Sequence, residues 1–281
     1  MFLRLNVLLV GLLTTVLLLP AATTNGERIY KGKPVDLGRF MYVVGITRAG
    51  QRFASCTGTL ISPDVVLTAA HCVCDQVNSN IYVGNDPTVP RPNMGYFKVD
   101  DWHSLARCDE SFEGKDIAVV HITPAISKFK PVVIASEAEL EHAAFFSVLG
   151  YGAVDRAGTD LSFDKRIAPV SPVDRNCAGV HEGLPATEYY GCQSGTEMVF
   201  GRPLSPDTCA GDSGGPLMVS TKGPNSKSDS DYVLVGVTNR AVASADAPCG
   251  SGGVYARLTT TNRTWILAAI ERMHGQKPKV I

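Results

Sequence analysis

The chain has 281 residues, 44% of them hydrophobic, so it can bury one large core or two smaller ones. Its formal net charge is −1 and it has no basic stripe, which argues against a nucleic-acid partner. The eight cysteines are an even number, as disulfide pairing in an oxidising compartment requires.

The N-terminus predicts a secretory signal peptide. Arg4 precedes a short apolar run that ends near Leu19, and the small residues Ala21 and Ala22 follow. The run is shorter than the roughly 20 residues of a membrane span, so we favour a signal over an anchor. We assign residues 1–22 to it, with cleavage between 21 and 26, and expect a secreted, extracellular protein outside the membrane.

Short apolar segments separated by turn residues predict an all-β barrel or sandwich. We find no linker long enough to separate independent domains. One helix is expected at about 262–273, where Thr261 or Asn262 can cap it and apolar residues recur at helical spacing. Asn262 also begins a glycosylation sequon, which is usable only if it is exposed. The expected strands include Met41–Ile46, Gly58–Ile61, Val65–Ala69, Ile117–Ile122 and Phe145–Leu149.

Three separated motifs carry candidate chemistry. His71 lies in Thr68-Ala-Ala-His-Cys72, and an imidazole, with its pKa of about 6.5, suits a general base. Asp116 opens an otherwise apolar strand, where an unpaired charge would be costly, and it can fix the tautomer of His71. Ser213 lies in Gly211-Asp-Ser-Gly-Gly-Pro216, a turn in which the backbone N–H groups of Gly211 and Ser213 can stabilise an oxyanion.

The order His71, Asp116, Ser213 is the triad order of chymotrypsin. Together with these motifs, the sequence resembles the trypsin/chymotrypsin family of serine proteases over about residues 29–273. The resemblance implies two packed six-stranded antiparallel β-barrels, at about 29–135 and 145–260, with catalysis in the cleft between them. It implies a secreted endopeptidase domain over 29–281 that acts on protein or peptide substrates without a cofactor.

The resemblance also implies activation by proteolysis. Residues 23–28 would be a short activation peptide, and an activating protease would cut after Arg28. The new ammonium group of Ile29 would then pair with the buried carboxylate of Asp212 and order the site. The chain departs from the family at Tyr30-Lys31, which is bulkier than usual, and Lys31 must stay near solvent.

Substrate selection is expected at Asp207, six residues before Ser213, where the family places the floor of its primary pocket. A carboxylate there selects Arg or Lys. Gly253 would keep the pocket wall open. Thr238, Asn239 and Arg240 replace the usual Ser-Trp-Gly of the rim. Arg240 would either reach down to Asp207 and block the pocket or point outward and select acidic residues, so we expect narrow specificity.

The resemblance implies the disulfides Cys56–Cys72, Cys177–Cys192 and Cys209–Cys249, and we predict that the remaining Cys74 and Cys108 also pair. Phe146 and Val219 occupy both places of a missing family bridge. A zinc cluster at His71-Cys72-Val73-Cys74 is a poor alternative because it lacks a second spaced pair. The Gly84–Asn93 segment lacks paired glutamates, so we expect no calcium there.

Two other functions are alternatives. A non-catalytic or self-inhibited protease homologue would act as a binding or regulatory protein; the intact motifs argue against it, while Asn239 and Arg240 keep it open. A Gly-x-Ser-x-Gly esterase lacks the required motif order. We expect a monomer with no nucleic-acid partner, and a protein inhibitor remains a potential partner.

Overall fold

The computed structural model describes residues 29–280 except 49, 52, 75–78, 85–94, 162–163 and 225. The predicted signal peptide, the activation peptide with Arg28, and residues 85–93 of the segment tested for calcium ligands lie outside the described residues. Within the described part, no helix is both long enough and apolar enough to cross a membrane.

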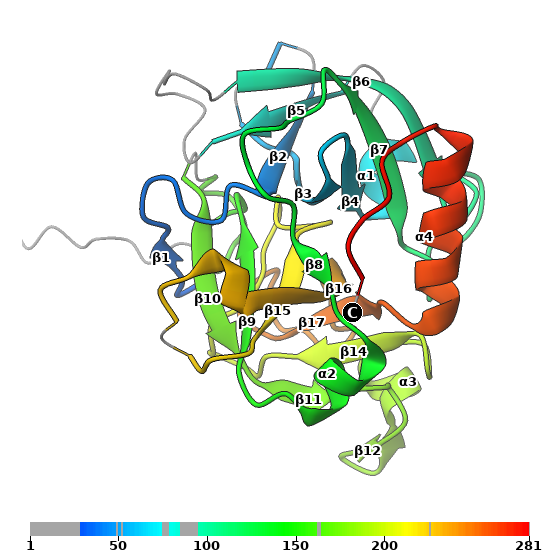
Figure 1. The fold of residues 1–281 in the computed structure, drawn as a ribbon. Helices are drawn as coiled ribbons and strands as arrows, with labels where there is room; N and C mark the ends of the chain where they lie inside the picture. Colours follow the sequence, from blue (N-terminus) through cyan, green and yellow to red (C-terminus); the bar gives the residue numbers. More distant parts are fainter. Residues whose placement is uncertain are drawn as a thin grey trace, which may run out of the picture.

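The first half of the chain closes into a six-stranded antiparallel barrel in the order β2-β3-β4-β7-β6-β5, in the upper part of Figure 1. Its strands are rich in Val, Ile and Leu, and β3 and β4 are buried along their whole length. The strands are β2 (Val43–Arg48), β3 (Cys56–Ser62), β4 (Val65–Thr68), β5 (Ser79–Val83), β6 (Gly95–Ser104) and β7 (Ala118–Thr123).

The second half, together with the short strand β1 near the N-terminus, forms a nine-stranded sheet below the barrel (Figure 1). Its main path is β1-β10-β9-β15-β16-β17-β14-β11, and β8 runs parallel to β16. The strands are β1 (Lys33–Pro34), β8 (Val133–Ile134), β9 (Phe146–Gly150), β10 (Arg166–Val170), β11 (Pro172–Asp174), β14 (Glu197–Phe200), β15 (Pro216–Ser220), β16 (Tyr232–Ala241) and β17 (Gly253–Arg257).

Short helices and one small hairpin decorate the two sheets. The hairpin joins β12 (Val180–His181) to β13 (Leu184–Pro185), and a 3-10 turn covers Asp229–Asp231. The helices are α1 (Ala70–Cys74), α2 (Glu137–His142), α3 (Ala186–Tyr189) and α4 (Thr260–Arg272). The predicted all-β class with a C-terminal helix is confirmed.

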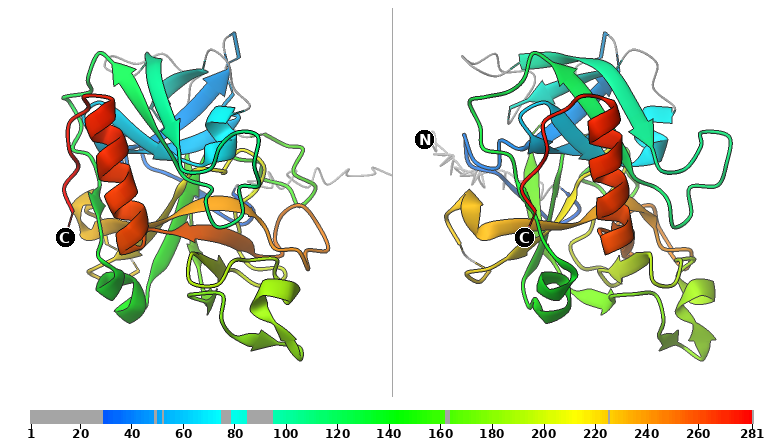
Figure 2. Two further views of the ribbon diagram at one scale, coloured as in Figure 1. Left: turned by 90° about the vertical axis from the view of Figure 1, so that its right-hand side faces the viewer. Right: turned by 45° about the vertical axis from the view of Figure 1, so that its right-hand side comes forward.

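Helix α4 packs along the first barrel against β7, as both views of Figure 2 show. It begins two residues earlier than expected, because Thr259 is the cap and its hydroxyl accepts a hydrogen bond from the Asn262 N–H at 3.2 Å. Asn262 therefore lies inside the first turn and is only 5% exposed, with its Nδ2 donating to the Arg257 carbonyl at 2.7 Å. The expectation of a usable glycosylation sequon is thus wrong for the folded chain, since this amide is buried and already bonded.

Hydrophobic side chains form a core in each half. In the second sheet, Phe146 on β9 lies directly opposite Val219 on β15 and is 2% exposed. In the sequence, Phe146 and Val219 stand at the two cysteine positions of a disulfide that this chain lacks. In the structure, an apolar contact between two neighbouring strands takes the place of that disulfide. The Phe146 ring also packs on Phe200, with ring centroids 4.8 Å apart.

Candidate active site

Strand register brings His71 and Asp116 together. In the first barrel Thr68, the last residue of β4, lies opposite Ala118, the first residue of β7. His71 follows β4 by three residues on α1, and Asp116 precedes β7 by two, so both side chains lie at the same end of this strand pair. His71 Nδ1 is 2.8 Å from Asp116 Oδ2, and the His71 backbone N–H donates to Asp116 Oδ1 at 3.0 Å.

These contacts fix the imidazole by both its ring and its backbone. Asp116 is 4% exposed, so its carboxylate depends on these bonds, while the His71 side chain is 27% exposed and its ring is open to solvent. With a carboxylate at Nδ1, the other ring nitrogen, Nε2, is left as the proton acceptor. The arrangement can therefore hold a general base in one tautomer.

Ser213 lies in a turn between Cys209 and β15 that requires glycine at two positions. Gly214 has φ +79°, and a Cβ there would fall 2.0 Å from Thr68 Oγ1 and 2.4 Å from the Thr57 carbonyl oxygen. Gly211 has φ +96° and approaches the Gly152 Cα so closely that a Cβ would be 3.0 Å from it. The two glycines let the turn enter the space between the barrel and the second sheet.

Hydrogen bonds from both halves hold the Ser213 turn. The Thr57 N–H on β3 donates to the Ser213 carbonyl at 2.8 Å, and the Thr57 hydroxyl donates to the Gly211 carbonyl at 2.9 Å. From the second sheet, the Gly214 N–H donates to the Thr238 carbonyl at 2.7 Å. Cys72, the neighbour of His71, has its Sγ 3.5 Å from the Ser213 carbonyl oxygen. The structure thus brings Ser213 to the junction that carries His71.

The structure contains the four predicted disulfides: Cys56–Cys72, Cys74–Cys108, Cys177–Cys192 and Cys209–Cys249. The first anchors α1 to β3, and the second ties the end of α1 to the segment that leads to Asp116. Because Cys72 and Cys74 are both oxidised, neither offers a thiolate to zinc, and the proximity of Cys56, Cys72 and His71 reflects the first bridge.

Asp212, the residue before Ser213, is fully buried. Its two oxygens accept from the Gly152 N–H at 2.7 Å and the Cys209 N–H at 2.9 Å. Burial raises the pKa of Asp212 to about 7, against the opposing effect of these two hydrogen bonds. In the described part of the chain, no cationic side chain bonds to it.

The segment that begins at Ile29 is already inserted in the second half. Ile29 is 0% exposed and packs with the second core, and the Tyr30 carbonyl accepts from the Asp207 N–H at 3.1 Å. Tyr30 also contacts the Cys209–Cys249 bridge. Lys31 stays exposed, as its charge requires, and its Nζ donates to the Leu204 carbonyl at 2.6 Å.

Asp207 lies under the short Gly250–Gly253 segment and is only 2% exposed. Its Oδ2 accepts from the N–H groups of Gly250, Ser251 and Gly252 at 3.0, 3.2 and 2.9 Å, while its Oδ1 accepts from the Thr208 N–H at 2.8 Å. Burial raises the pKa of Asp207 to about 6, although these four donors oppose the shift. A Cβ on Gly253 would fall 3.2 Å from Thr208 Oγ1, so a side chain there would crowd this corner.

Arg240 neither blocks Asp207 nor points freely outward. Its Nη1 and Nη2 bond to Glu197 Oε1 and Oε2 at 2.7 and 2.8 Å, and Nη2 also donates to the Gly191 carbonyl at 2.6 Å. Burial would lower the pKa of Arg240, but the hydrogen bonds and charge of Glu197 outweigh it and raise the pKa. Both expected orientations of Arg240 are therefore wrong, because a fully buried carboxylate captures its guanidinium.

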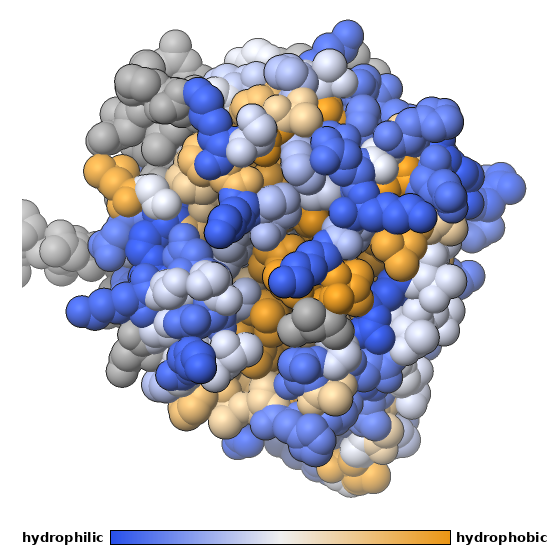
Figure 3. All heavy atoms as spheres, in the orientation of Figure 1, coloured by the Kyte–Doolittle hydropathy of each residue, from blue (hydrophilic) through white to orange (hydrophobic). Residues whose placement is uncertain are grey.

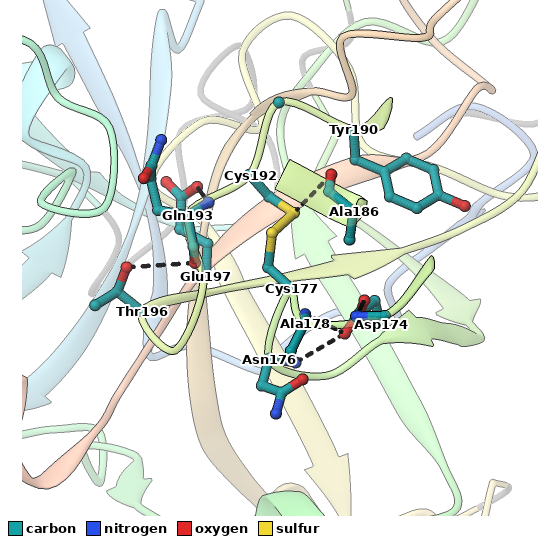
Figure 4. The surroundings of a disulfide bond; sticks show 12 residues. Asp174, Asn176, Cys177, Ala178, Ala186, Tyr190, Cys192, Gln193, Thr196 and Glu197 are labelled. Carbon is teal, nitrogen blue, oxygen red and sulfur yellow. Dashed lines mark hydrogen bonds between the residues drawn. A yellow bond between two sulfur atoms is a disulfide. The ribbon is translucent and has the colours of Figure 1, made fainter. Parts of the chain in front are cut away.

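Sequence reasoning missed Glu197. It opens the apolar strand β14 and lies beside the Cys177–Cys192 bridge with Gln193 (Figure 4), whose N–H donates to Glu197 Oε2 at 2.8 Å. Glu197 Oε1 also accepts from the Gly114 N–H at 3.0 Å, two residues before Asp116. The sequence signal was the same as at Asp116, a carboxylate at the start of a buried strand.

Comparisons with known proteins identify the family of the chain. A sequence model of the family described as Trypsin matches residues 29–266. The chain belongs to the trypsin family. Family membership places it among serine proteases, hydrolases whose substrates are proteins.

Trypsin from Saccharopolyspora erythraea is 31% identical to the chain over 219 residues, which cover 76% of this chain and 85% of that one. Trypsin delta from Drosophila melanogaster is 26% identical over 245 residues, covering 86% and 88% of the two chains. The solved structure of neuropsin, a serine protease expressed in the limbic system of mouse brain, matches with a TM-score of 0.65 at 20% identity. It covers 84% of this chain and 97% of neuropsin, and it supports the trypsin fold.

Proposed function

We propose that the chain is the precursor of a secreted serine endopeptidase, with Ser213 as nucleophile, His71 as general base and Asp116 as the group that orients His71. The observation that carries the proposal is the double contact of Asp116 with the His71 ring and backbone, at the junction that also holds the Ser213 turn. A serine hydroxyl needs such a base, because it is a weak nucleophile until its proton is removed.

In the proposed reaction, His71 Nε2 takes the hydroxyl proton as Ser213 Oγ attacks the peptide carbonyl. The N–H groups of Gly211 and Ser213 stabilise the oxyanion, and each such donor typically contributes about 3–4 kcal/mol to the transition state. The imidazolium then protonates the leaving amine. Water hydrolyses the acyl-enzyme by the same steps, with His71 again as base.

The substrate backbone would bind along β16. Strand β15 pairs with β16 as far as Val237, whereas β17 follows it to Ala241, so β16 continues past the Ser213 turn with one neighbour. A peptide can add to such an edge as a further strand. Arg240 lies two residues beyond Thr238, so its ion pair with Glu197 would line this edge and narrow the choice of substrate.

Activation would follow cleavage after Arg28. The new ammonium group at Ile29 would pair with Asp212, whose buried carboxylate has no cation among its described partners. Burial of Ile29 and the bond between Tyr30 and Asp207 support this, since they hold the segment next to the stretch of chain that leads to Asp212.

Selection of Arg or Lys would require substrate access to Asp207. At 2% exposure the carboxylate is nearly covered, so the Gly250–Gly252 segment must yield to a substrate guanidinium. The same observation favours a second candidate, a self-inhibited protease homologue whose pocket stays closed.

A turnover assay tests the proposal. The purified chain is cut after Arg28, its Ile29 terminus is confirmed by sequencing, and hydrolysis of Arg- and Phe-based peptide amides is measured. We expect Arg-selective turnover that Ser213→Ala abolishes, and Asp207→Ser should remove the preference for Arg while leaving slow general hydrolysis. If the correctly processed chain hydrolysed neither amide, the proposal of an active protease would be overturned and the self-inhibited homologue would be favoured.

A further inference from the structure

A hollow of about 720 Å³ is lined by residues of the first barrel, of the segment that leads into β8 and of the C-terminal segment. Its apolar lining includes Met41, Ile61, Phe129, Val132 and Tyr232. None of the residues proposed for catalysis or substrate selection lines it. Figure 3, in the orientation of Figure 1, shows hydrophobic surface at the centre of the face turned to the viewer, with hydrophilic side chains around it. The volume is typical of a ligand-binding site.

Four exposed lysines surround this hollow, and they come from two extended segments. Lys128 and Lys130 flank Phe129, and Lys277 and Lys279 flank Pro278. The Ile134 N–H donates to the Lys279 carbonyl at 3.0 Å and so holds the C-terminal segment beside the strand that follows Lys130. Each lysine can lay its aliphatic stem along the apolar lining and keep its ammonium group at the rim.

The acidic residue in the lining is already compensated. Asp229 pairs with Arg39 at 2.7 Å and accepts from the Phe40 N–H at 2.6 Å. At the rim, Lys277 Nζ lies 3.9 Å from Glu271 Oε1, so the positive charge of the rim comes mainly from Lys130 and Lys279, above an apolar floor. Charge complementarity calls for an anionic partner that also brings apolar groups.

A second hollow of about 300 Å³ adjoins the first and shares Lys128 and Phe129 with it. Tyr96, Phe97 and Ile126 contribute to its lining. The two hollows share a wall formed by Lys128 and Phe129, and so they offer two neighbouring apolar sites. An extended peptide fits this shape better than a single small anion, because its side chains can enter both hollows while its carboxylates meet the lysines.

We propose that this surface is an exosite for an acidic peptide segment that carries apolar side chains, belonging to a partner or substrate protein. The lysines would steer the acidic segment and the hollows would hold its apolar residues. The proposal stands apart from the proposed catalysis, since binding at the exosite needs neither Ser213 nor cleavage after Arg28.

A binding experiment with the full chain tests the exosite. The probe is a short fluorescent peptide in which glutamate alternates with phenylalanine or leucine, and its anisotropy is followed as protein is added. Two matched peptides replace either every glutamate by glutamine or every apolar residue by serine. We expect saturable binding of the probe and about 10-fold weaker binding of either matched peptide.

Charge-reversal variants locate the site. Lys130→Glu/Lys279→Glu should weaken probe binding by about 10-fold or more, whereas Lys98→Glu/Lys222→Glu, an equal charge change at exposed lysines outside both hollows, should leave it within about 2-fold. Absence of saturable binding, or equal losses in the two double variants, would overturn the exosite. The exosite would also be overturned if the peptide with serine in place of every apolar residue bound as tightly as the probe, or if a heparin fragment, which has no apolar side chains, displaced the probe. Either result would show a general binding surface for polyanions.

Discussion

Four buried carboxylates around the proposed site are held in different ways. Asp116 contacts His71, Glu197 pairs with Arg240, and Asp207 accepts four backbone N–H groups. Asp212 is bonded to two N–H groups but to no cation among the described residues. A buried charge is costly without a partner. Of these four carboxylates, Asp212 should therefore gain the most stabilisation from a new ammonium group nearby.

The ion pair of Glu197 and Arg240 gives a residue-scale prediction. Glu197→Gln keeps the size of the side chain and an acceptor oxygen for the Gly114 N–H, although it loses the acceptor for the Gln193 N–H. It leaves the 33% exposed Arg240 side chain with an uncompensated charge. The test compares two substrates of the processed chain, which carry either glutamate or glutamine two residues before the cleaved arginine. We expect Glu197→Gln to raise the ratio of their kcat/KM values, glutamate substrate over glutamine substrate, about 5-fold.

The double variant Glu197→Gln/Arg240→Gln is the matched control and should return the ratio to about that of the unmodified enzyme. An unchanged ratio in Glu197→Gln would show that Glu197 does not mask the charge of Arg240 from substrate.

Single residues also show where sequence reasoning was limited. The contacts of His71 with Asp116 could be anticipated, because a carboxylate at the start of an apolar strand needs a partner. The direction of Arg240 could not, because it depends on Glu197, 43 positions earlier in the chain. Burial of Asn262 depended on one helix cap, Thr259, which lies two residues before Thr261 and three before Asn262, the two expected caps.

Elements position the site through strand register and disulfides. The pairing of Thr68 with Ala118 aligns α1 with the start of β7, and Cys74–Cys108 ties the end of α1 to the segment before Asp116. The strands were predictable from their apolar runs and the turns between them. The pairing order β1-β10-β9-β15-β16-β17-β14-β11 was not, because it rests on contacts between distant segments.

Removal of the Cys74–Cys108 bridge tests this positioning at the element scale. We expect Cys74→Ser/Cys108→Ser to lower the free energy of unfolding by about 2–4 kcal/mol and to lower kcat more than it raises KM, because His71 and Asp116 lose a constraint. Chemical denaturation and steady-state kinetics measure the two effects.

Cys177→Ser/Cys192→Ser is the comparison, since that bridge lies beside Glu197 and far in sequence from His71. It should also lower stability, but its kinetic effect should fall mainly on KM. Equal losses of kcat in the two double variants would argue against a specific positioning role for Cys74–Cys108.

At the scale of the whole molecule, the two halves meet at the Ser213 turn, and the segment from Ile29 inserts into the second. Burial raises the pKa of Asp212 from 3.8 to about 7. A carboxyl group with a raised folded-state pKa contributes stability while it is protonated, and this contribution is lost as the pH rises through about 7. The uncleaved chain should therefore lose stability over this range.

Cleavage after Arg28 should change this pH dependence. An ammonium group beside Asp212 stabilises the carboxylate, so the processed chain should not lose stability as the pH rises. The Tm of the processed chain minus the Tm of the precursor should therefore increase by at least about 4 °C between about pH 4 and pH 7. Differential scanning calorimetry of both forms measures it, and Asp212→Asn should flatten the difference. A difference that is constant with pH in the unmodified chain would contradict the pairing of Ile29 with Asp212.

The central claim, that His71 and Asp116 activate Ser213, is tested most directly by labelling with a fluorophosphonate, which reacts with an activated serine. The processed chain, its precursor and the processed His71→Ala variant are each incubated with the reagent, digested and examined by mass spectrometry. The account predicts a single adduct on the peptide that contains Ser213 in the processed chain, and at most slow labelling of the other two. No adduct on Ser213 in a chain with a confirmed Ile29 terminus, or equal labelling of the His71→Ala variant, would contradict it.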